Sequence, residues 1–139
     1  AKMPLLGMII KAYGIVSFKP GSGMEKSLSE PFAILRAGGV VGIFPEGHFA
    51  QEGKTYEAKP GIAYLAFKSS APILPIALEG ASRLSFFNFL WRQKYMRVSF
   101  GKPFLITEIA PFLHSQSSKE DFSRAAQLIM EQIRKLYTG

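Results

Sequence analysis

Apolar and polar positions along the chain alternate between helix-like and strand-like patterns. Helical spacing of apolar residues is found at residues 4–12, from an N-cap at Ser29 to Ala37, and from Pro60 to about Ser70. Continuous or alternating apolar runs, which are typical of strands, are found at residues 14–18, 40–44, 73–78 and 96–100. This order predicts an α/β fold with a mostly parallel mixed sheet flanked by helices. With no linker-like stretch in 139 residues, we expect a single domain over residues 1–139.

Glycine and proline mark several ends of these elements. Gly38-Gly39 follows the helix that ends at Ala37, where the chain needs a positive φ angle. Pro75 stands inside the apolar run of residues 73–78 and cannot donate to a strand ladder, so this strand is expected to be at an edge or kinked.

The C-terminal helix has the strongest pattern. Ser118 and Asp121 have the spacing of a capping box, in which each side chain accepts a hydrogen bond from the other residue's backbone. One apolar stripe follows, formed by Phe122, Ala126, Ile129, Ile133 and Leu136.

Ligands of α/β folds bind beyond the carboxyl ends of the strands, so the segment after residues 40–44 is the first candidate site. It reads Phe44-Pro45-Glu46-Gly47-His48, and the Glu46 carboxylate can accept hydrogen bonds from hydroxyl groups. A tight turn with a solvated glutamate is the alternative. Lys59 then precedes a helix start at Pro60, where free N–H groups and the helix dipole favour an anion.

Charge narrows the classes of ligand. The chain has 17 Lys and Arg against 10 Asp and Glu, a net charge of +7, which attracts phosphate on nucleic acid, on lipid headgroups or on a small substrate. It has no cysteine, which excludes disulfides, thiolate metal sites and cysteine nucleophiles. The strongest apolar run, residues 4–10, is shorter than the roughly 20 residues of a membrane-spanning helix.

Residues 80–107 combine cations with aromatic rings and contain no acid. Such a mixture suits a lipid interface, although it also binds single-stranded nucleic acid by stacking, and some of these rings belong to a core. We assign Phe100 and Phe104 to the core. The residues expected at a membrane surface are Phe86, Phe87, Phe89, Trp91 and Arg92.

The motifs together resemble the PlsC-type glycerolipid acyltransferases, the family of 1-acylglycerol-3-phosphate acyltransferases. The resemblance rests on Phe44-Pro45-Glu46-Gly47, on Lys59-Pro60-Gly61 and on the strand Ile73-Leu74-Pro75-Ile76, in the family's order and spacing. It implies a glycerol-phosphate acyltransferase-like fold and transfer of an acyl group from acyl-CoA or acyl carrier protein to a lysophospholipid hydroxyl. No metal or redox cofactor is implied, and nucleic acid is not an implied partner.

The resemblance also assigns roles to residues. The substrate-binding set that it implies is Lys19, Phe44, Pro45, Glu46, Gly47, His48 and Lys59. Two departures from the family pattern stand out. Phe49 replaces an Arg and Ala50 a Ser. Lys19, the cation nearest to the family's acceptor-binding Arg, lacks the bidentate fork of an arginine.

The family's catalytic block, His followed by four residues and Asp, is not found in this sequence. Gly53 stands five positions after His48, and Lys119 stands five positions after His114. We therefore expect an N-terminally incomplete piece of a longer enzyme, inactive alone and membrane-associated at the cytoplasmic face. His48 is a weak candidate for the base. The alternative is a non-enzymatic basic module that binds an anionic membrane surface or nucleic acid.

Overall fold

The computed structural model describes residues 24–47, 57–79 and 97–137. The chain forms two compact units, Ala1–Val41 and Gly42–Gly139, which are described separately. The helix predicted over residues 4–12 and the strand predicted over residues 14–18 lie outside the described residues. The single domain over residues 1–139 stays a prediction.

In the first unit, helix α2 spans Met24–Arg36 and buries Leu28 and Pro31. It ends in a Schellman motif, because the Gly38 amide donates to the Leu35 carbonyl and the Gly39 amide to the Ile34 carbonyl. Gly38 has a φ of +79°, so the predicted glycine terminus is confirmed.

The predicted start of this helix was wrong. Ser29 lies inside α2, and its hydroxyl donates to the Lys26 carbonyl at 2.9 Å. A serine within a helix satisfies its hydroxyl locally in this way, so a residue type typical of N-caps does not by itself mark a helix start.

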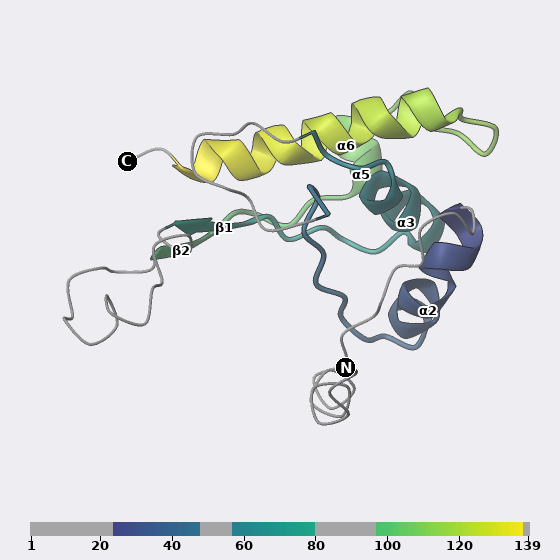
Figure 1. Ribbon diagram of the computed structural model, residues 1–139, viewed down its shortest axis with the longest axis horizontal. Coiled ribbons are helices and arrows are strands. Elements are labelled where there is room, and N and C mark those ends of the chain that lie inside the picture. The colour runs from purple at the N-terminus through teal and green to yellow at the C-terminus, as the bar shows by residue number, and fades with distance from the viewer. Residues whose placement is uncertain (1–23, 48–56, 80–96, 138–139) are drawn as a thin grey trace, which may run out of the picture. The chain divides into compact units, whose positions relative to one another are not determined.

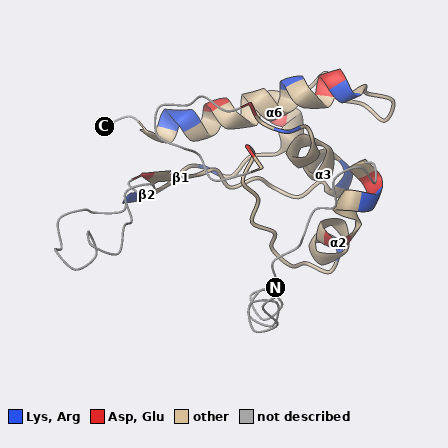
Figure 2. Ribbon diagram, viewed as in Figure 1, with Lys and Arg blue, Asp and Glu red and all other residues tan. Residues whose placement is uncertain are grey.

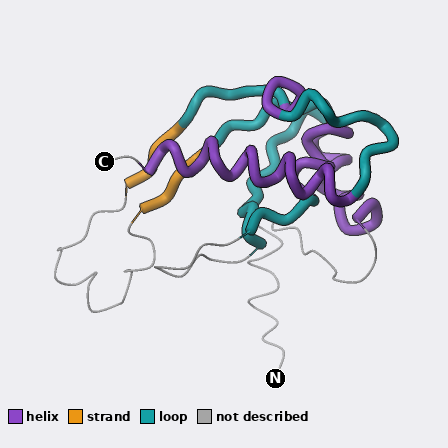
Figure 3. Tube along the Cα trace, turned by 90° about the horizontal axis from the view of Figure 1, so that it is seen from above, coloured by secondary structure: helices purple, strands orange, loops and turns teal. Residues whose placement is uncertain are grey.

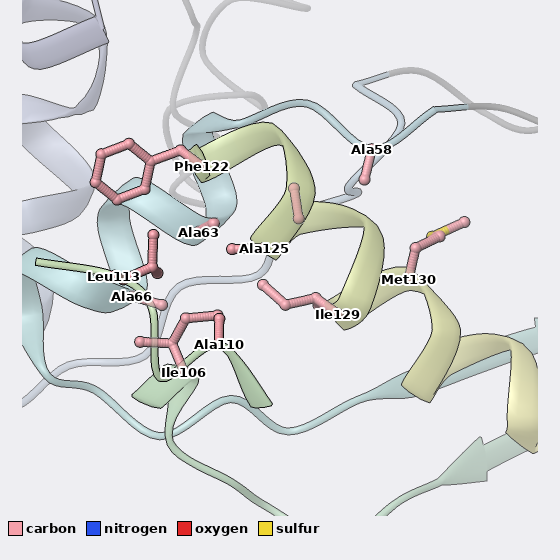
Figure 4. Packing of buried hydrophobic residues seen from close by; sticks show 11 residues of the cluster. Ala58, Ala63, Ala66, Ile106, Ala110, Leu113, Phe122, Ala125, Ile129 and Met130 are labelled. Carbon is pink, nitrogen blue, oxygen red and sulfur yellow. The ribbon is translucent and has the colours of Figure 1, made fainter. Parts of the chain in front are cut away.

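In the second unit, α3 (Gly61–Ser69) packs against α6 (Lys119–Arg134), with the short α5 (Ile106–Ile109) beside them (Figure 1). Small side chains on α3 and α6, among them Ala63 and Ala125, let the helices approach closely. Tyr64 and Phe67 meet the buried Phe122 edge to face. Figure 4 shows this core, whose buried members are Ala58, Ala63, Ala66, Ile106, Ala110, Leu113, Phe122, Ala125, Ala126, Ile129 and Met130.

The predicted capping box of the C-terminal helix is confirmed. The Asp121 amide donates to the Ser118 hydroxyl at 3.2 Å, and the Ser118 amide donates to the Asp121 carboxylate at 2.9 Å. Helix α6 ends at Arg134, and a 3-10 turn, η2 (Lys135–Tyr137), carries Leu136 beyond the α-helical stripe. The sequence pattern had not predicted α5, which is only four residues long.

Strands β1 (Ile76–Glu79) and β2 (Arg97–Phe100) form an antiparallel pair near the C-terminal end of α6 (Figures 1 and 3). Ile73 and Phe104 form a separate antiparallel bridge. Pro75 lies between the bridge and β1, so the strand predicted over residues 73–78 is interrupted at the proline, and β1 is an edge strand of the two-stranded sheet. The Pro75 carbonyl accepts a hydrogen bond from Gly101 at 2.9 Å, which uses the group that proline still offers to a ladder.

Two strand predictions differ from the structure. Residues 40–44 are not a strand, and Val40 is 92% exposed. The only sheet among the described residues is the antiparallel β1–β2 pair, so the mostly parallel mixed sheet is not seen there. A continuous apolar run indicates burial on both faces, but strand formation also needs a partner at the right distance, which local sequence does not encode. The placement of Phe100 in the core was also wrong, since its side chain is 65% exposed, whereas Phe104 packs against the core.

Candidate functional site

Phe44, Pro45, Glu46 and Gly47 form a tight turn at the beginning of the second unit. The Gly47 amide donates to the Phe44 carbonyl at 3.0 Å, which is the closing hydrogen bond of a β-turn. The Pro45 ring is buried, whereas the Glu46 side chain is half-buried and Phe44 is 52% exposed. The turn is thus anchored by its proline and presents its glutamate toward the surface.

A backbone hydrogen bond ties this turn to the start of α3. The Lys59 amide donates to the Pro45 carbonyl at 2.8 Å. The neighbouring Ala58 is buried in the helical core, so the segment that carries Lys59 is anchored as well. Glu46 and Lys59, which are separated by 12 intervening positions, are therefore attached to backbone that is held together.

The Lys59 side chain passes over the turn at Gly47, where there is no side chain in its way. A Cβ atom at Gly47 would lie 2.8 Å from Lys59 Cε and 2.9 Å from Lys59 Nζ. Gly47 also has a φ of +73°, which residues with a Cβ atom rarely adopt. Glycine meets both conditions without displacing the lysine, so Gly47 leaves room for the observed path of the Lys59 side chain.

The start of α3 adds to the positive potential at this place. Pro60 is the N-cap residue, and it makes no side-chain hydrogen bond to the first turn. The first turn of α3 carries no acid. The free N–H groups of that turn and the helix dipole therefore favour an anion near the start of α3, which Lys59 precedes by one residue.

The arrangement combines a hydrogen-bond acceptor with cationic donors. The Glu46 carboxylate accepts from hydroxyl groups, and the exposed Lys59 ammonium donates to anionic oxygens. A ligand that carries both a hydroxyl and an anionic group suits this pair of side chains. The described residues hold no group of three or more His, Cys, Asp or Glu side chains able to bind a metal ion.

Four of the predicted site residues are brought together: Pro45, Glu46, Gly47 and Lys59. Phe44 belongs to the same turn through its carbonyl. The other predicted residues lie outside the described part of the chain, namely Lys19, His48, Phe86, Phe87, Phe89, Trp91 and Arg92. His114 is exposed, and its Nδ1 atom accepts from the Gln116 amide at 3.2 Å.

Sequence reasoning missed two features of the site. It named Gly47 and Lys59 separately and did not predict that the Lys59 side chain passes over Gly47. It also did not foresee the Pro45–Lys59 hydrogen bond. Both connect segments separated by more than ten positions, for which a single sequence carries no periodic signal.

The comparisons with known proteins agree on one family. The sequence model of the Acyltransferase family matches residues 1–79. The chain is 28% identical over 127 residues to a 1-acyl-sn-glycerol-3-phosphate acyltransferase of Bacillus subtilis, covering 91% of this chain and 58% of that protein. It is 28% identical over 85 residues to the chloroplastic 1-acyl-sn-glycerol-3-phosphate acyltransferase BAT2 of Brassica napus, covering 59% of this chain and 24% of that protein. The chain thus spans little more than half of the first relative and about a quarter of the second. No solved structure matches it significantly.

Proposed function

The chain belongs to the PlsC-type acyltransferase family, and from this premise we propose that the protein containing it transfers an acyl group to the free hydroxyl of a lysophospholipid of the 1-acylglycerol-3-phosphate type. The acyl donor is a thioester, either acyl-CoA or an acyl carrier protein that bears the acyl group. The new ester bond forms at the acceptor oxygen, the carbon–sulfur bond breaks, and the hydroxyl proton ends on the released thiol.

The observation that carries this proposal is the attachment of the Phe44–Gly47 turn to the start of α3. Through the Lys59–Pro45 hydrogen bond, one short stretch of surface offers the Glu46 carboxylate and the Lys59 ammonium. Glu46 would accept a hydrogen bond from the glycerol part of the acceptor, and Lys59 with the α3 N-terminus would hold its phosphate. Such contacts raise the rate by fixing the acceptor oxygen relative to the thioester.

The residues that move the proton are not among those described. In this family a His followed by four residues and Asp is the implied base, and residues 1–139 contain no such pair. The role of the described residues is therefore binding and orientation of the acceptor. We assign the base to a segment of the intact protein that precedes the Phe44–Gly47 turn.

Replacing Glu46 tests the role of the turn. In a longer version of the chain that carries the His-Asp pair, Glu46→Gln should lower kcat/KM for acyl transfer by about tenfold or more, because a hydrogen bond to a charged group is lost. Glu57→Gln is the matched control, since Glu57 is exposed and lies just ahead of the tied segment. Equal kcat/KM values for the Glu46→Gln and wild-type enzymes would remove Glu46 from the site.

Acceptor binding tests the anion subsite without any turnover. Calorimetric titration of the 139-residue chain with a short-chain lysophosphatidate should show binding that weakens as salt is raised, since phosphate held by cations is screened. Lys59→Gln should weaken this binding by about tenfold or more. Binding that is indifferent to both salt and Lys59 would contradict the phosphate assignment.

The location proposed for the protein is the cytoplasmic face of a membrane, where lysophospholipids are found. Support comes from the cationic and aromatic composition of residues 80–96, including Phe86, Phe87, Phe89, Trp91 and Arg92. Within the described ranges, no helix combines the length and apolar character that crossing a bilayer requires.

A further inference from the structure

Lys59 combines an anchored backbone with an accessible side chain. Its amide donates to the Pro45 carbonyl at 2.8 Å, and the preceding residue, Ala58, is buried. The residue itself is exposed, and its side chain passes over Gly47. Within the described residues, no carboxylate forms an ion pair with the Lys59 ammonium group. The backbone therefore fixes the point from which one accessible nitrogen atom reaches the candidate site.

The acceptor assigned to this site determines where the acyl thioester must lie. In a lysophospholipid of the 1-acylglycerol-3-phosphate type, adjacent carbon atoms of the glycerol carry the free hydroxyl and the phosphate. A hydroxyl oxygen about to react lies about 3–3.5 Å from the carbonyl carbon that it attacks. If Lys59 holds the phosphate, the thioester carbonyl is therefore within reach of the flexible Lys59 side chain.

We propose that Lys59 is a site of self-acylation, at which the acyl thioester modifies the lysine when no acceptor is bound. This inference rests on the proposed function, because the place of the thioester follows from the phosphate contact assigned to Lys59. A lysine amine that has lost its proton is a nucleophile toward carbonyl carbon. Holding the amine and the thioester at one site makes their reaction faster than a chance encounter in solution.

The reaction is an aminolysis of the thioester. The Lys59 ammonium releases one proton to solvent, and its nitrogen then attacks the carbonyl carbon of the acyl group. The carbon–nitrogen bond of an amide forms, the carbon–sulfur bond breaks, and a second proton passes from the nitrogen to the departing thiolate. The products are an amide at the Lys59 nitrogen and the free thiol of coenzyme A or of the carrier protein. No further reactant is required.

The modification removes the charge that this site offers to phosphate. An amide nitrogen is uncharged, so the acylated side chain no longer attracts the acceptor phosphate. Bound acceptor in turn protects Lys59, because its phosphate engages the ammonium group. Self-acylation thus lowers the activity of the enzyme when the donor is in excess and the acceptor is scarce.

Peptide mass spectrometry tests the position of the acyl group. A longer version of the chain that carries the His-Asp pair is incubated without acceptor. The donor is palmitoyl-CoA or palmitoyl-acyl carrier protein, whichever supports acyl transfer. Lys59 should be acylated about tenfold faster or more than Lys68 and Lys119, because the thioester is held beside Lys59 alone. These comparison lysines are also exposed and belong to α3 and α6, whose cations are blue in Figure 2.

Adding the acceptor tests the protection of Lys59. A short-chain lysophosphatidate should slow the acylation of Lys59 and leave the acylation of Lys68 and Lys119 unchanged, since only the first amine meets the phosphate. Protection of all three lysines to the same degree would show that the acceptor merely consumes the donor, and would contradict the inference.

Two substitutions separate self-acylation from other causes of lost activity. Preincubation with the donor until Lys59 is acylated should lower kcat/KM for the acceptor about tenfold or more, because a charge-assisted contact is lost. An arginine keeps the charge but is not converted to an amide, so preincubation should leave the rate of Lys59→Arg at its own starting value. Lys68→Arg is the matched control, and preincubation should lower its kcat/KM as it does in the wild type.

Each other outcome overturns the inference. Equal acylation of Lys59, Lys68 and Lys119 would assign the reaction to solvent exposure alone. An unmodified Lys59 in an enzyme that transfers acyl groups normally would refute self-acylation and leave the proposed function standing. Absence of acyl transfer with both donors would contradict the proposed function, and the inference would fall with it.

Discussion

Gly47 is the residue on which the geometry of the candidate site depends most directly. Its positive φ closes the turn, and its missing side chain leaves room for the Lys59 methylene groups. Gly47→Ala should therefore have two effects: a loss of stability of about 1–2 kcal/mol from the left-handed backbone, and displacement of the Lys59 ammonium. We expect titration with a short-chain lysophosphatidate to show binding about tenfold weaker or more, comparable to losing a charge-assisted hydrogen bond.

Variants at two other glycines distinguish the loss of stability from the displacement of the Lys59 side chain. Gly38 has nearly the same φ, +79°, but no atom lies within 4 Å of the position of its Cβ. Gly38→Ala should therefore lower stability to a similar degree without changing acceptor binding. Gly42 has neither the positive φ nor a close neighbour, and Gly42→Ala should change neither quantity. Equal loss of binding in the Gly38 and Gly47 variants would show that strain, not the lysine, is responsible.

Single residues also show how far the sequence could predict this site. The order Phe-Pro-Glu-Gly followed by Lys-Pro-Gly led, through the resemblance to a family, to the prediction that Glu46, Gly47 and Lys59 belong to one site. The proximity of these residues could not be predicted, because it depends on the path of a long side chain and on a hydrogen bond between separate segments. The residue types suggested the chemistry that we propose, whereas their proximity could be seen only in the folded chain.

Among the elements, α6 has an N-terminus whose stability should depend on pH. The backbone N–H of Ser118 and then its hydroxyl donate to the Asp121 carboxylate, which lowers the pKa of this group, and the charges of Arg124 and His114 act in the same direction. The folded state thus favours the ionised form. The resulting stabilisation is complete above the unfolded pKa, about 3.9, and is lost as pH falls through the lower folded pKa.

Thermal unfolding at several pH values measures this effect. The difference in Tm between the wild type and Asp121→Asn should be constant from neutral pH to about pH 5 and shrink below about pH 4. Ser118→Ala removes the hydroxyl but keeps the backbone donor, so it should shift the same transition by less. A Tm difference that stays constant throughout the acid range would show that the charge of the Asp121 carboxylate does not stabilise the start of α6.

The elements differ in how well local sequence predicted them. Helices α3 and α6 were predicted well because their caps, spacing and ends are encoded within a few residues. The run at residues 40–44 was misread as a strand, since none of these residues is buried or paired in the structure, and apolar composition alone encodes neither property. For β2 the alternation of Val98 and Phe100 was correct, but which face the helices would cover was not contained in it.

At the scale of the whole molecule, the buried cluster formed by the described helices lies within one unit. All members of the buried helical cluster lie between Ala58 and Met130, and thus inside the unit Gly42–Gly139. Aromatic edge-to-face contacts between α3 and α6 belong to the same unit. Burial of apolar surface is the dominant stabilising term in folding, so this cluster is the main source of stability among the described residues.

From this distribution we predict that residues 42–139 fold without residues 1–41. The shortened chain should keep the helical circular dichroism of α3 and α6 and unfold cooperatively. Its Tm should lie within about 5 °C of the full chain, because a domain of this size changes by that amount for about 1 kcal/mol. Phe122→Ala should lower Tm in both chains to the same degree, since its partners Tyr64 and Phe67 are present in each.

A second truncation makes the result interpretable. Removing residues 119–139 deletes α6, and with it Phe122, Ala125, Ala126, Ile129 and Met130 from the core, so cooperative unfolding should disappear. If the chain of residues 42–139 instead melts without cooperativity, residues 1–41 complete the same folding unit, and the prediction of one domain over residues 1–139 holds. Cooperative melting would assign the candidate site at Glu46 and Lys59 to a unit that is stable by itself.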